Sequence, residues 1–540
     1  MMKPNRAETF KAKFLLSHGN NSRYYEVLKC YKEDWMQSSY IVDESLVKRY
    51  SKFSKRQLNA SSDGCELKLE EMRVKMADEN YVNFRFNSGL PLQVIAPEGD
   101  ARLELQSRLP ARLQDVSSGR NVSAIAAGGH ITSMQWLPQD DVDEDTTDSY
   151  LAVSIVNSPK LPHGLTATSK EISVFEDRSS GLIDSAVQIW KFNTLSNEVS
   201  LEKMVLTSSH GTPFDLQWSL VAPQNKESNT VLGVLGVVFN DGTVQILKIT
   251  RDLPMYSLLE KSSLSFRSSD ETSSDITCFA FLGVDKLLAG TASGYLMEFK
   301  LDSPNHHSSS SSPLPSYKMF VSDGPISTIV PVETSSGESM VLVNGQAIRG
   351  SAFSDTNPIQ DVYAPLLEKS NVKPSYNYIM QDLIIAHNVE LAKIVGLRSL
   401  QDNGSEILRV SGYITTFKLS ERLGHPFMLT GTASGDVILM NYARKYFTRR
   451  GGNKSLSPLK IWKLQWNNPK EAVLTLDARY EKIEVESPVS ASVMPKEVMI
   501  SSLAWNENVN GSSIYAAGTA SGLLLVERLD PSFNVNSDLN

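Results

Sequence analysis

Short apolar runs alternate with tight polar turns along most of this chain. The five residues Gly-Thr-Ala-Ser-Gly occur three times, at residues 290–294, 431–435 and 518–522. Each copy follows a short apolar run and precedes a segment in which apolar and polar residues alternate. Alternation with a period of two is typical of a half-buried strand, and Ser-Gly is typical of a tight turn. Each copy therefore predicts a β-hairpin.

Three further turns fall in the same frame and extend the pattern to six. The turn positions are Asp184, Asp241, Ser293, Asn344, Ser434 and Ser521, separated by 57, 52, 51, 90 and 87 residues. An apolar strand precedes each hairpin, at residues 131–136, 214–218, 276–281, 326–330, 413–417 and 500–505. A four-stranded propeller blade takes about forty to fifty residues, so the first three intervals each fit one blade and the last two nearly fit two.

The repeat predicts an all-β fold, a WD40-type β-propeller with an N-terminal, partly helical extension. We expect seven blades, while six or eight stay open. A hidden blade is expected in one of the long intervals, at residues 375–409 or 474–498. Residues 81–86 alternate well enough to add a strand where the N-terminal region closes the ring beside the last blade.

Eight residues are predicted to hold structural blade positions: His130, Asp184, Trp190, Asp241, Ser293, Asn344, Ser434 and Ser521. Asp184 and Trp190 keep the spacing of a WD repeat, and a Gly-His pair ends at His130. We expect hydrogen bonds to run from the Asp184 carboxylate through the His130 ring and a strand hydroxyl to the indole N–H of Trp190. These roles are structural rather than catalytic.

The first eighty residues differ in character from the rest. Tyr24, Leu28, Tyr31 and Trp35 recur at helical spacing. A helix with three aromatic side chains on one face must bury them, so we expect it to dock on the propeller flank, with an external partner as the alternative. The predicted domains are an extension at 1–80, a propeller at 81–530 and a tail at 531–540, with loop insertions near 139–149, 303–315, 355–375, 445–458 and 470–498.

Composition and motifs exclude several function classes. The three cysteines form no Cys-x-x-Cys pair, and neither the Gly-Lys of a phosphate-binding loop nor a His-Glu-x-x-His metal motif occurs. The longest apolar run, residues 231–239, is too short to cross a bilayer. We therefore predict a protein that is not an enzyme, with no cofactor, no metal, no small-molecule substrate and no membrane partner.

Two basic segments stand out in a chain whose net charge is −8. The first, residues 47–56, carries Lys48, Arg49, Lys52, Lys55 and Arg56, and the second, residues 442–454, carries Arg444, Lys445, Arg449, Arg450 and Lys454. Aromatic residues are interleaved with the cations in both segments, as in sites that bind nucleic acid. The segments are candidate contacts to DNA or to a partner protein, and a solvated loop or a nuclear import signal is the alternative.

Several longer stretches resemble one family beyond the general repeat. They include GGHITSMQWLP, LGVLGVVFNDGTVQILKI, HPFMLTGTASGDVILMNYARK and ISSLAWNENVNGSSIYAAGTASGLLLVERLD. Spread over residues 128–530, these stretches are similar to the WD-repeat subunit of the RNA polymerase III general transcription factor TFIIIC that belongs to its B-box-binding half.

The resemblance implies a nuclear scaffold subunit on the internal promoters of tRNA genes. Its implied partners are a second WD-repeat propeller subunit and the large B-box-binding subunit, with DNA contacted within the complex. The short N-terminal segment departs from the long basic extensions of related chains, which argues against independent DNA binding. A WD40 adaptor of another intracellular complex and a propeller enzyme are the competing hypotheses.

Overall fold

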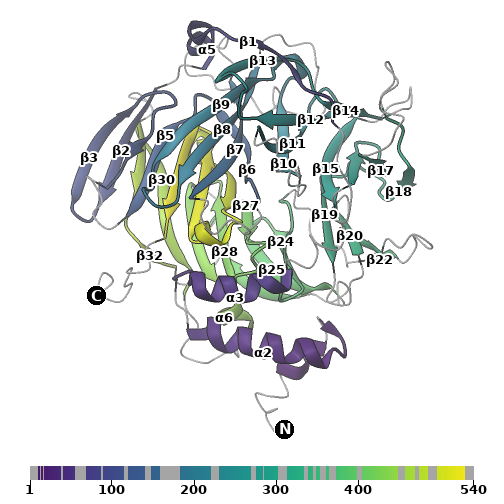
Figure 1. Ribbon diagram of the computed structural model, residues 1–540. Coiled ribbons are helices and arrows are strands. Elements are labelled where there is room, and N and C mark those ends of the chain that lie inside the picture. Colours follow the sequence, from purple (N-terminus) through teal and green to yellow (C-terminus); the bar gives the residue numbers. More distant parts are fainter. Residues whose placement is uncertain are drawn as a thin grey trace.

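The computed structural model is mostly β and propeller-like (Figure 1). Helices α2, α3 and α6 gather at one end of the molecule and α5 lies at the opposite end. The structure describes residues 10–12, 14–15, 18–37, 40–54, 69–86, 89–114, 120–139, 147–157, 183–219, 230–268, 275–283, 285–301, 313–333, 339–344, 348–352, 361–363, 372–397, 404–447, 457–468, 473–483 and 495–529. The central part of each predicted loop insertion and the predicted tail at 531–540 lie outside these residues.

The described strands form seven sheets, numbered here in chain order of their innermost strands. Sheet 1 contains β6 (His130–Trp136), β7 (Asp148–Asn157), β8 (Asp184–Asn193) and β9 (Val199–Leu206), extended by β13 (Tyr256–Lys261) and β1 (Arg73–Met76). Sheet 2 contains β10 (Pro213–Trp218), β11 (Val231–Phe239), β12 (Thr243–Thr250) and β14 (Leu264–Arg267). Sheet 3 contains β15 (Ile276–Leu282), β16 (Lys286–Thr291), β17 (Tyr295–Lys300) and β18 (Tyr317–Phe320).

The other four sheets continue this order. Sheet 4 contains β19 (Thr328–Glu333), β20 (Ser339–Asn344), β21 (Ile348–Ala352) and β22 (Asp361–Tyr363), and sheet 5 contains β23 (Ser375–Asn377), β24 (Asp382–Asn388), β25 (Leu391–Gly396) and β26 (Ser405–Arg409). Sheet 6 contains β27 (Ile414–Leu419), β28 (Phe427–Thr432), β29 (Asp436–Asn441), β30 (Leu459–Asn468), β31 (Val473–Asp477), β2 (Leu90–Ala96) and β3 (Gly99–Leu105), with β32 (Glu481–Lys482) beside β30. Sheet 7 contains β33 (Ile500–Trp505), β34 (Ile514–Thr519), β35 (Leu523–Arg528), β5 (Asn121–Ala126) and β4 (Ala111–Arg112).

The innermost strands of neighbouring sheets contact one another in order. From β6 the contacts run through β10, β15, β19, β23 and β27 to β33, and β33 contacts β6 again. The six inner strands predicted from the sequence correspond to β6, β10, β15, β19, β27 and β33. The hidden sheet lies at residues 375–409, the first of the two predicted places, whereas the described part of 474–498 belongs to the outer side of sheet 6 and to the short turn Lys496–Val498.

The strand predicted at residues 81–86 is wrong, because this segment lies within helix α5 (Glu79–Phe86). Asp78 begins the helix by accepting a hydrogen bond from the Val82 N–H through its backbone oxygen, at 3.1 Å. Val82 and Phe86, four residues apart, are buried on one face, whereas Phe84 is 79% exposed. A strand would place Val82, Phe84 and Phe86 on the same face, so the helical period fits the burial and the period of two does not.

The strand that joins the N-terminal region to the last sheet is β5. It pairs antiparallel with β35, so that residues from the two parts of the chain share sheet 7. The strand beside the last sheet is therefore β5 rather than the predicted strand at residues 81–86. Likewise β1, which precedes the predicted boundary at residue 80, pairs with β13 in sheet 1.

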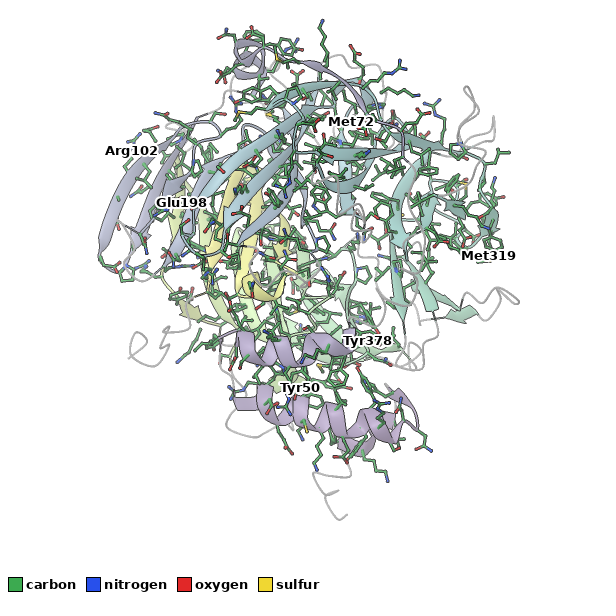
Figure 2. All side chains as sticks on the ribbon, viewed as in Figure 1. Tyr50, Met72, Arg102, Glu198, Met319 and Tyr378 are labelled. Carbon is green, nitrogen blue, oxygen red and sulfur yellow. The ribbon has the colours of Figure 1, made fainter. Side chains whose placement is uncertain are left out.

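The N-terminal helices dock on one end of sheets 5, 6 and 7. Tyr24, Leu28, Tyr31 and Trp35 of α2 (Ser22–Gln37) are all buried, as predicted. The Tyr31 hydroxyl donates to the backbone oxygen of Gly424 at 2.8 Å, and the Asn441 amide donates to the backbone oxygen of Trp35 at 3.0 Å. Helix α3 (Glu44–Ser54) lies beside α2, and Figure 2 labels Tyr50 between the two helices.

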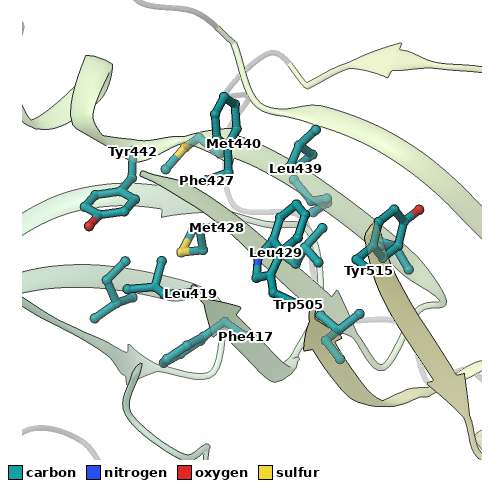
Figure 3. Packing of buried hydrophobic residues seen from close by; sticks show 14 of the residues in the cluster. Phe417, Leu419, Phe427, Met428, Leu429, Leu439, Met440, Tyr442, Trp505 and Tyr515 are labelled. Carbon is teal, nitrogen blue, oxygen red and sulfur yellow. The ribbon is translucent and has the colours of Figure 1, made fainter. Parts of the chain in front are cut away.

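The largest core cluster fills sheets 5, 6 and 7 and the space beneath α2. Figure 3 shows part of it, with Phe417, Leu429 and Trp505 packed between β27, β28 and β33. Trp505 also donates its indole N–H to the backbone oxygen of Lys418 in the preceding sheet at 3.2 Å. Trp136 and Trp218, at the ends of other inner strands, make the same kind of bond to the preceding sheet, at 3.3 and 3.1 Å. The indoles therefore hold neighbouring sheets together as well as filling the core.

Candidate functional site

The three Gly-Thr-Ala-Ser-Gly copies form one hydrogen-bonded turn, found in sheets 3, 6 and 7. In each copy the threonine Oγ1 accepts a hydrogen bond from the backbone N–H four residues later. These bonds join Tyr295 to Thr291, Asp436 to Thr432 and Leu523 to Thr519, at 2.9, 3.0 and 2.9 Å. The last glycine has a φ of 82°, 88° or 84°, a conformation that residues with a Cβ rarely adopt. The serine therefore belongs to a structural turn.

The first glycine of each copy allows the next sheet to pack closely against it. A Cβ on Gly290, Gly431 or Gly518 would lie 2.7, 2.6 or 2.7 Å from Cγ2 of Ile326, Ile500 or Ile131 respectively. Real Cβ atoms do not approach so closely, so a side chain here would push the sheets apart. The backbone oxygens of the same isoleucines accept hydroxyl hydrogen bonds from Thr277, Thr415 and Ser501, at 2.5, 2.5 and 2.6 Å. The repeated motif is thus both a turn and a contact between sheets.

The hydrogen bonds predicted around Asp184 and Trp190 are wrong. The Trp190 indole donates to Gln188 Oε1 at 3.0 Å, and Asp184 forms an ion pair with Arg85 of α5, at 3.0 Å. Arg85 therefore takes the place that the prediction gave to His130. The sequence did not reveal this because Arg85 lies 99 residues from Asp184, in a helix that the prediction assigned to a strand. Burial lowers the pKa of His130 to about 4, so its ring is neutral near pH 7.

A network of the expected kind lies in sheet 2. His210 Nδ1 is 2.8 Å from Asp241 Oδ2, and Asp241 Oδ1 accepts hydrogen bonds from the N–H and hydroxyl of Thr243 at 3.0 and 2.6 Å. Gln245 Nε2 donates to the Thr243 hydroxyl at 2.6 Å. The Asp-Gly turn at Asp241 and the His-Gly pair at His210 were the signals in the sequence. The other turn residues also lie as expected: Ser293, Ser434 and Ser521 are in turns and Asn344 ends β20.

A buried ion pair that the sequence did not reveal joins sheets 6 and 7. Arg120, directly before β5, donates from Nε and Nη2 to the two carboxylate oxygens of Glu527, both at 2.8 Å. Its Nη1 donates to the backbone oxygens of Ile461 and Ala478, at 2.8 and 2.7 Å, and its guanidinium lies 3.4 Å from the centre of the Trp462 ring. Trp462 Nε1 and the Tyr515 hydroxyl also donate to Glu527. Each nitrogen of the Arg120 guanidinium therefore donates to an acceptor, which offsets the desolvation of this buried charge pair.

The structure brings parts of the two basic segments to the same end of the molecule. Lys48, Arg49 and Lys52 are exposed on α3. Arg444 is half-buried and Lys445 exposed on α6 (Tyr442–Phe447), which packs against α2. Lys55, Arg56, Arg449, Arg450 and Lys454 lie outside the described residues. The exposed cations form a candidate surface for a negatively charged partner.

Two negative findings apply to the described residues. No group of three or more histidine, cysteine, aspartate or glutamate side chains among them is arranged to hold a metal ion. None of the helices in that part of the chain has the length and apolar character needed to cross a membrane. The buried thiol of Cys278, whose pKa burial raises to about 12, is a poor nucleophile near pH 7.

Comparison with known proteins gives two relatives and one structural match. The chain is 25% identical over 429 residues to the transcription factor tau 91 kDa subunit of Saccharomyces cerevisiae, covering 74% of this chain and 57% of that protein. It is 22% identical over 415 residues to the transcription factor tau subunit sfc6 of Schizosaccharomyces pombe, covering 75% of this chain and 64% of that protein. The chain thus spans about three fifths of the length of these curated relatives.

Among solved structures, the crystal structure of Chaetomium thermophilum Raptor matches with a TM-score of 0.45 and 10% identity, covering 76% of this chain and 28% of that chain. No protein-family model matches the chain. The two tau subunits match about three quarters of the chain, the extent over which the sequence motifs indicated a resemblance to a TFIIIC subunit. That resemblance is confirmed: the chain is related to the transcription factor tau, or TFIIIC, subunits of two yeasts.

Proposed function

We propose that this chain is a non-enzymatic scaffold subunit of TFIIIC. In this role it supports binding of the complex to B-box promoter DNA and assembly of the RNA polymerase III machinery on tRNA genes. Its partners are a second propeller subunit and the large DNA-binding subunit, and its location is the nucleus. The similarity to two tau subunits over about three quarters of the chain is the observation that carries the proposal.

We further propose that the seven sheets are the blades of one closed propeller. The order of contacts between innermost strands, with β33 against β6, supports this number. The pairing of β5 with β35 supports closure, because one sheet then contains strands from both parts of the chain. The extension at 1–80 and the propeller at 81–530 are the proposed domains, with β1 of the extension added to the edge of sheet 1.

The internal contacts are those of a rigid support rather than of a catalyst. Tryptophan indoles, hydroxyls and the Arg120–Glu527 pair each join one sheet to the next. Their polar groups form hydrogen bonds and ion pairs that hold the sheets together, so none of these groups is placed to transfer a proton or to attack a substrate. The surface at the end formed by α2, α3 and α6 is left for partners or DNA.

Purification of the tagged chain from its own cells tests the proposal. The expected result is recovery of the other tau subunits in amounts comparable with that of the tagged chain, after washing at moderate salt. Recovery of a ubiquitin-ligase or trafficking assembly without any tau subunit would overturn the proposal in favour of a WD40 adaptor. A matched control carries the tag on an unrelated propeller protein.

A further inference from the structure

We infer that the outer edge of β3 pairs with the same edge of a second copy of this chain, the two strands running antiparallel. The inference goes beyond the proposed function, because it concerns contact between two copies of the chain rather than contact with other subunits. The observations that carry it are the length of this edge, the direction of its backbone groups and the charge pattern of its side chains.

Strand β3 is the outermost strand of sheet 6. Among the described strands it pairs only with β2, and Figure 1 shows it at the outer margin of the molecule. It contains seven residues, whereas the outermost strands of the other six sheets contain two to five. Natural proteins keep such edges short, because a long free edge pairs with other chains. The length of β3 therefore sets it apart from the other outer strands.

The backbone of β3 presents N–H and C=O groups at this outer edge. A two-residue turn at 97–98 joins β2 to β3, and bonded and non-bonded residue pairs alternate from that turn along the hairpin. Asp100, Arg102 and Glu104 fall at the non-bonded pairs, so their backbone groups point away from β2. Pro91, which has no N–H, lies opposite Glu104 and agrees with this pattern. The edge thus offers a row of donors and acceptors to another extended strand.

The side chains of β3 show what kind of strand fits beside it. Asp100, Arg102 and Glu104 are exposed on one face, with 3.6 Å between Arg102 Nε and Glu104 Oε1. Ala101 and Leu103 are half-buried on the other face, where Leu103 packs against the largest core cluster. A further strand would remove the exposed part of these apolar side chains from water, which stabilises the pairing. The edge therefore fits a strand with apolar residues at alternate positions.

The charges on β3 are complementary to those of a second copy of the same strand. An antiparallel pair with its twofold axis at Arg102 would place this arginine opposite its own copy. An axis at Leu103, one residue along, places Arg102 of each copy opposite Glu104 of the other and brings the two Leu103 side chains together. Opposite charges and apolar side chains that face one another stabilise antiparallel strands. Charge complementarity thus selects a second copy, joined through the same surface on both chains.

Sedimentation of the purified full chain over a range of concentrations tests the inference. The mass should rise toward that of two chains only in the micromolar range or above, because one pair of strands is a small interface. Arg102→Glu makes the three charged side chains of β3 all acidic, so this variant should stay monomeric. The matched control, Arg73→Glu, makes the same charge change at an exposed residue of β1, whose edge has only four residues, and should associate like the unchanged chain.

A charge-swapped variant separates loss of pairing from loss of folding. Changing Asp100→Lys and Glu104→Lys together makes the three charged side chains of β3 all basic, so this variant should also stay monomeric when alone. Mixed with the Arg102→Glu variant, it should form a mixed dimer, because every acid then faces a base. Association regained on mixing requires that both variants are folded and that the two edges touch.

Three outcomes would overturn the inference. An unchanged chain that stays monomeric at every concentration, up to several hundred micromolar, has no edge that pairs with its own copy. An association that persists in Arg102→Glu would come from another surface. Variants of opposite charge that stay apart when mixed would show that the charges on β3 do not face one another.

Discussion

Gly518 in sheet 7 packs against Ile131 in sheet 1, where a Cβ on the glycine would lie 2.7 Å from the isoleucine Cγ2. The contact joins the last Gly-Thr-Ala-Ser-Gly copy to the first inner strand, and the Ser501 hydroxyl donates to the Ile131 backbone oxygen beside it at 2.6 Å. The pair repeats the relationships of Gly290 with Ile326 and Gly431 with Ile500. One contact therefore recurs between sheets and also links the last sheet to the first.

Gly518→Ala should lower the free energy of unfolding by about 1 to 3 kcal/mol, because the added methyl group has no space against Ile131. Urea denaturation followed by fluorescence measures the change. Ile131→Leu removes the Cγ2 methyl group that the added Cβ would meet, and the double variant should recover part of the loss. Additive effects of the two changes would show that the residues do not touch.

Ser521→Asp and Ser434→Asp should differ although they alter the same turn position. The Ser521 hydroxyl lies 2.9 Å from that of Thr519, and residue 523 is leucine, so an aspartate meets no acid and should change stability by less than about 0.5 kcal/mol. The Ser434 hydroxyl donates to Asp436 at 3.0 Å, so an aspartate there places two carboxylates together and should cost about 1 kcal/mol. Thermal unfolding of the two variants side by side makes the comparison. A larger loss for Ser521→Asp would contradict the turn geometry.

Glu527→Gln should destabilise the protein by about 3 kcal/mol, because it leaves the Arg120 guanidinium charged and buried without its carboxylate. Glu481→Gln is the matched control, since Glu481 pairs with Lys460 at 2.9 Å with 64% of its side chain exposed. The control should cost less than about 1 kcal/mol. Chemical denaturation of both variants checks the difference, and equal losses would show that the buried pair adds nothing.

Stability should fall as the pH is lowered from about 6.5, in part because of His425. Burial lowers the pKa of this residue to about 3, whereas in the unfolded chain the pKa is about 6.5. Between these values the unfolded state binds more protons, so one histidine contributes a slope of up to about 1.4 kcal/mol per pH unit, and its full contribution is present above about pH 6.5. His425→Phe keeps a ring against Trp505 and should reduce the slope between pH 6 and 4 by that amount. An unchanged slope would mean that His425 titrates normally in the folded protein.

The sequence predicted the repeated part of the fold well, because each repeat can be recognised from residues that are close together in the sequence. The alternating strands, the three identical turns and the aromatic stripe of α2 each depend on neighbours within a few residues. The missing sheet at 375–409 was placed correctly as one of two alternatives, since its strands are apolar but lack the turn motif.

What the sequence could not predict depends on contacts between distant residues. The partner of Asp184 is Arg85 and the partner of Glu527 is Arg120, pairs separated by 99 and 407 positions. Helix α5 was mistaken for a strand because its residues fit both periods, and burial against the sheets decided the outcome. For the candidate surface, the sequence revealed both basic segments but not that α3 and α6 lie at the same end of the molecule.

Chromatin occupancy of the tagged chain tests the central claim, membership of the RNA polymerase III factor, most directly. The account predicts that crosslinked chromatin recovered with the chain is strongly enriched in tRNA genes, with the signal centred on the internal promoter, relative to protein-coding genes of similar transcription level. Enrichment at neither tRNA genes nor any other gene with an internal promoter, from a chain shown to be present in the same cells, would contradict it.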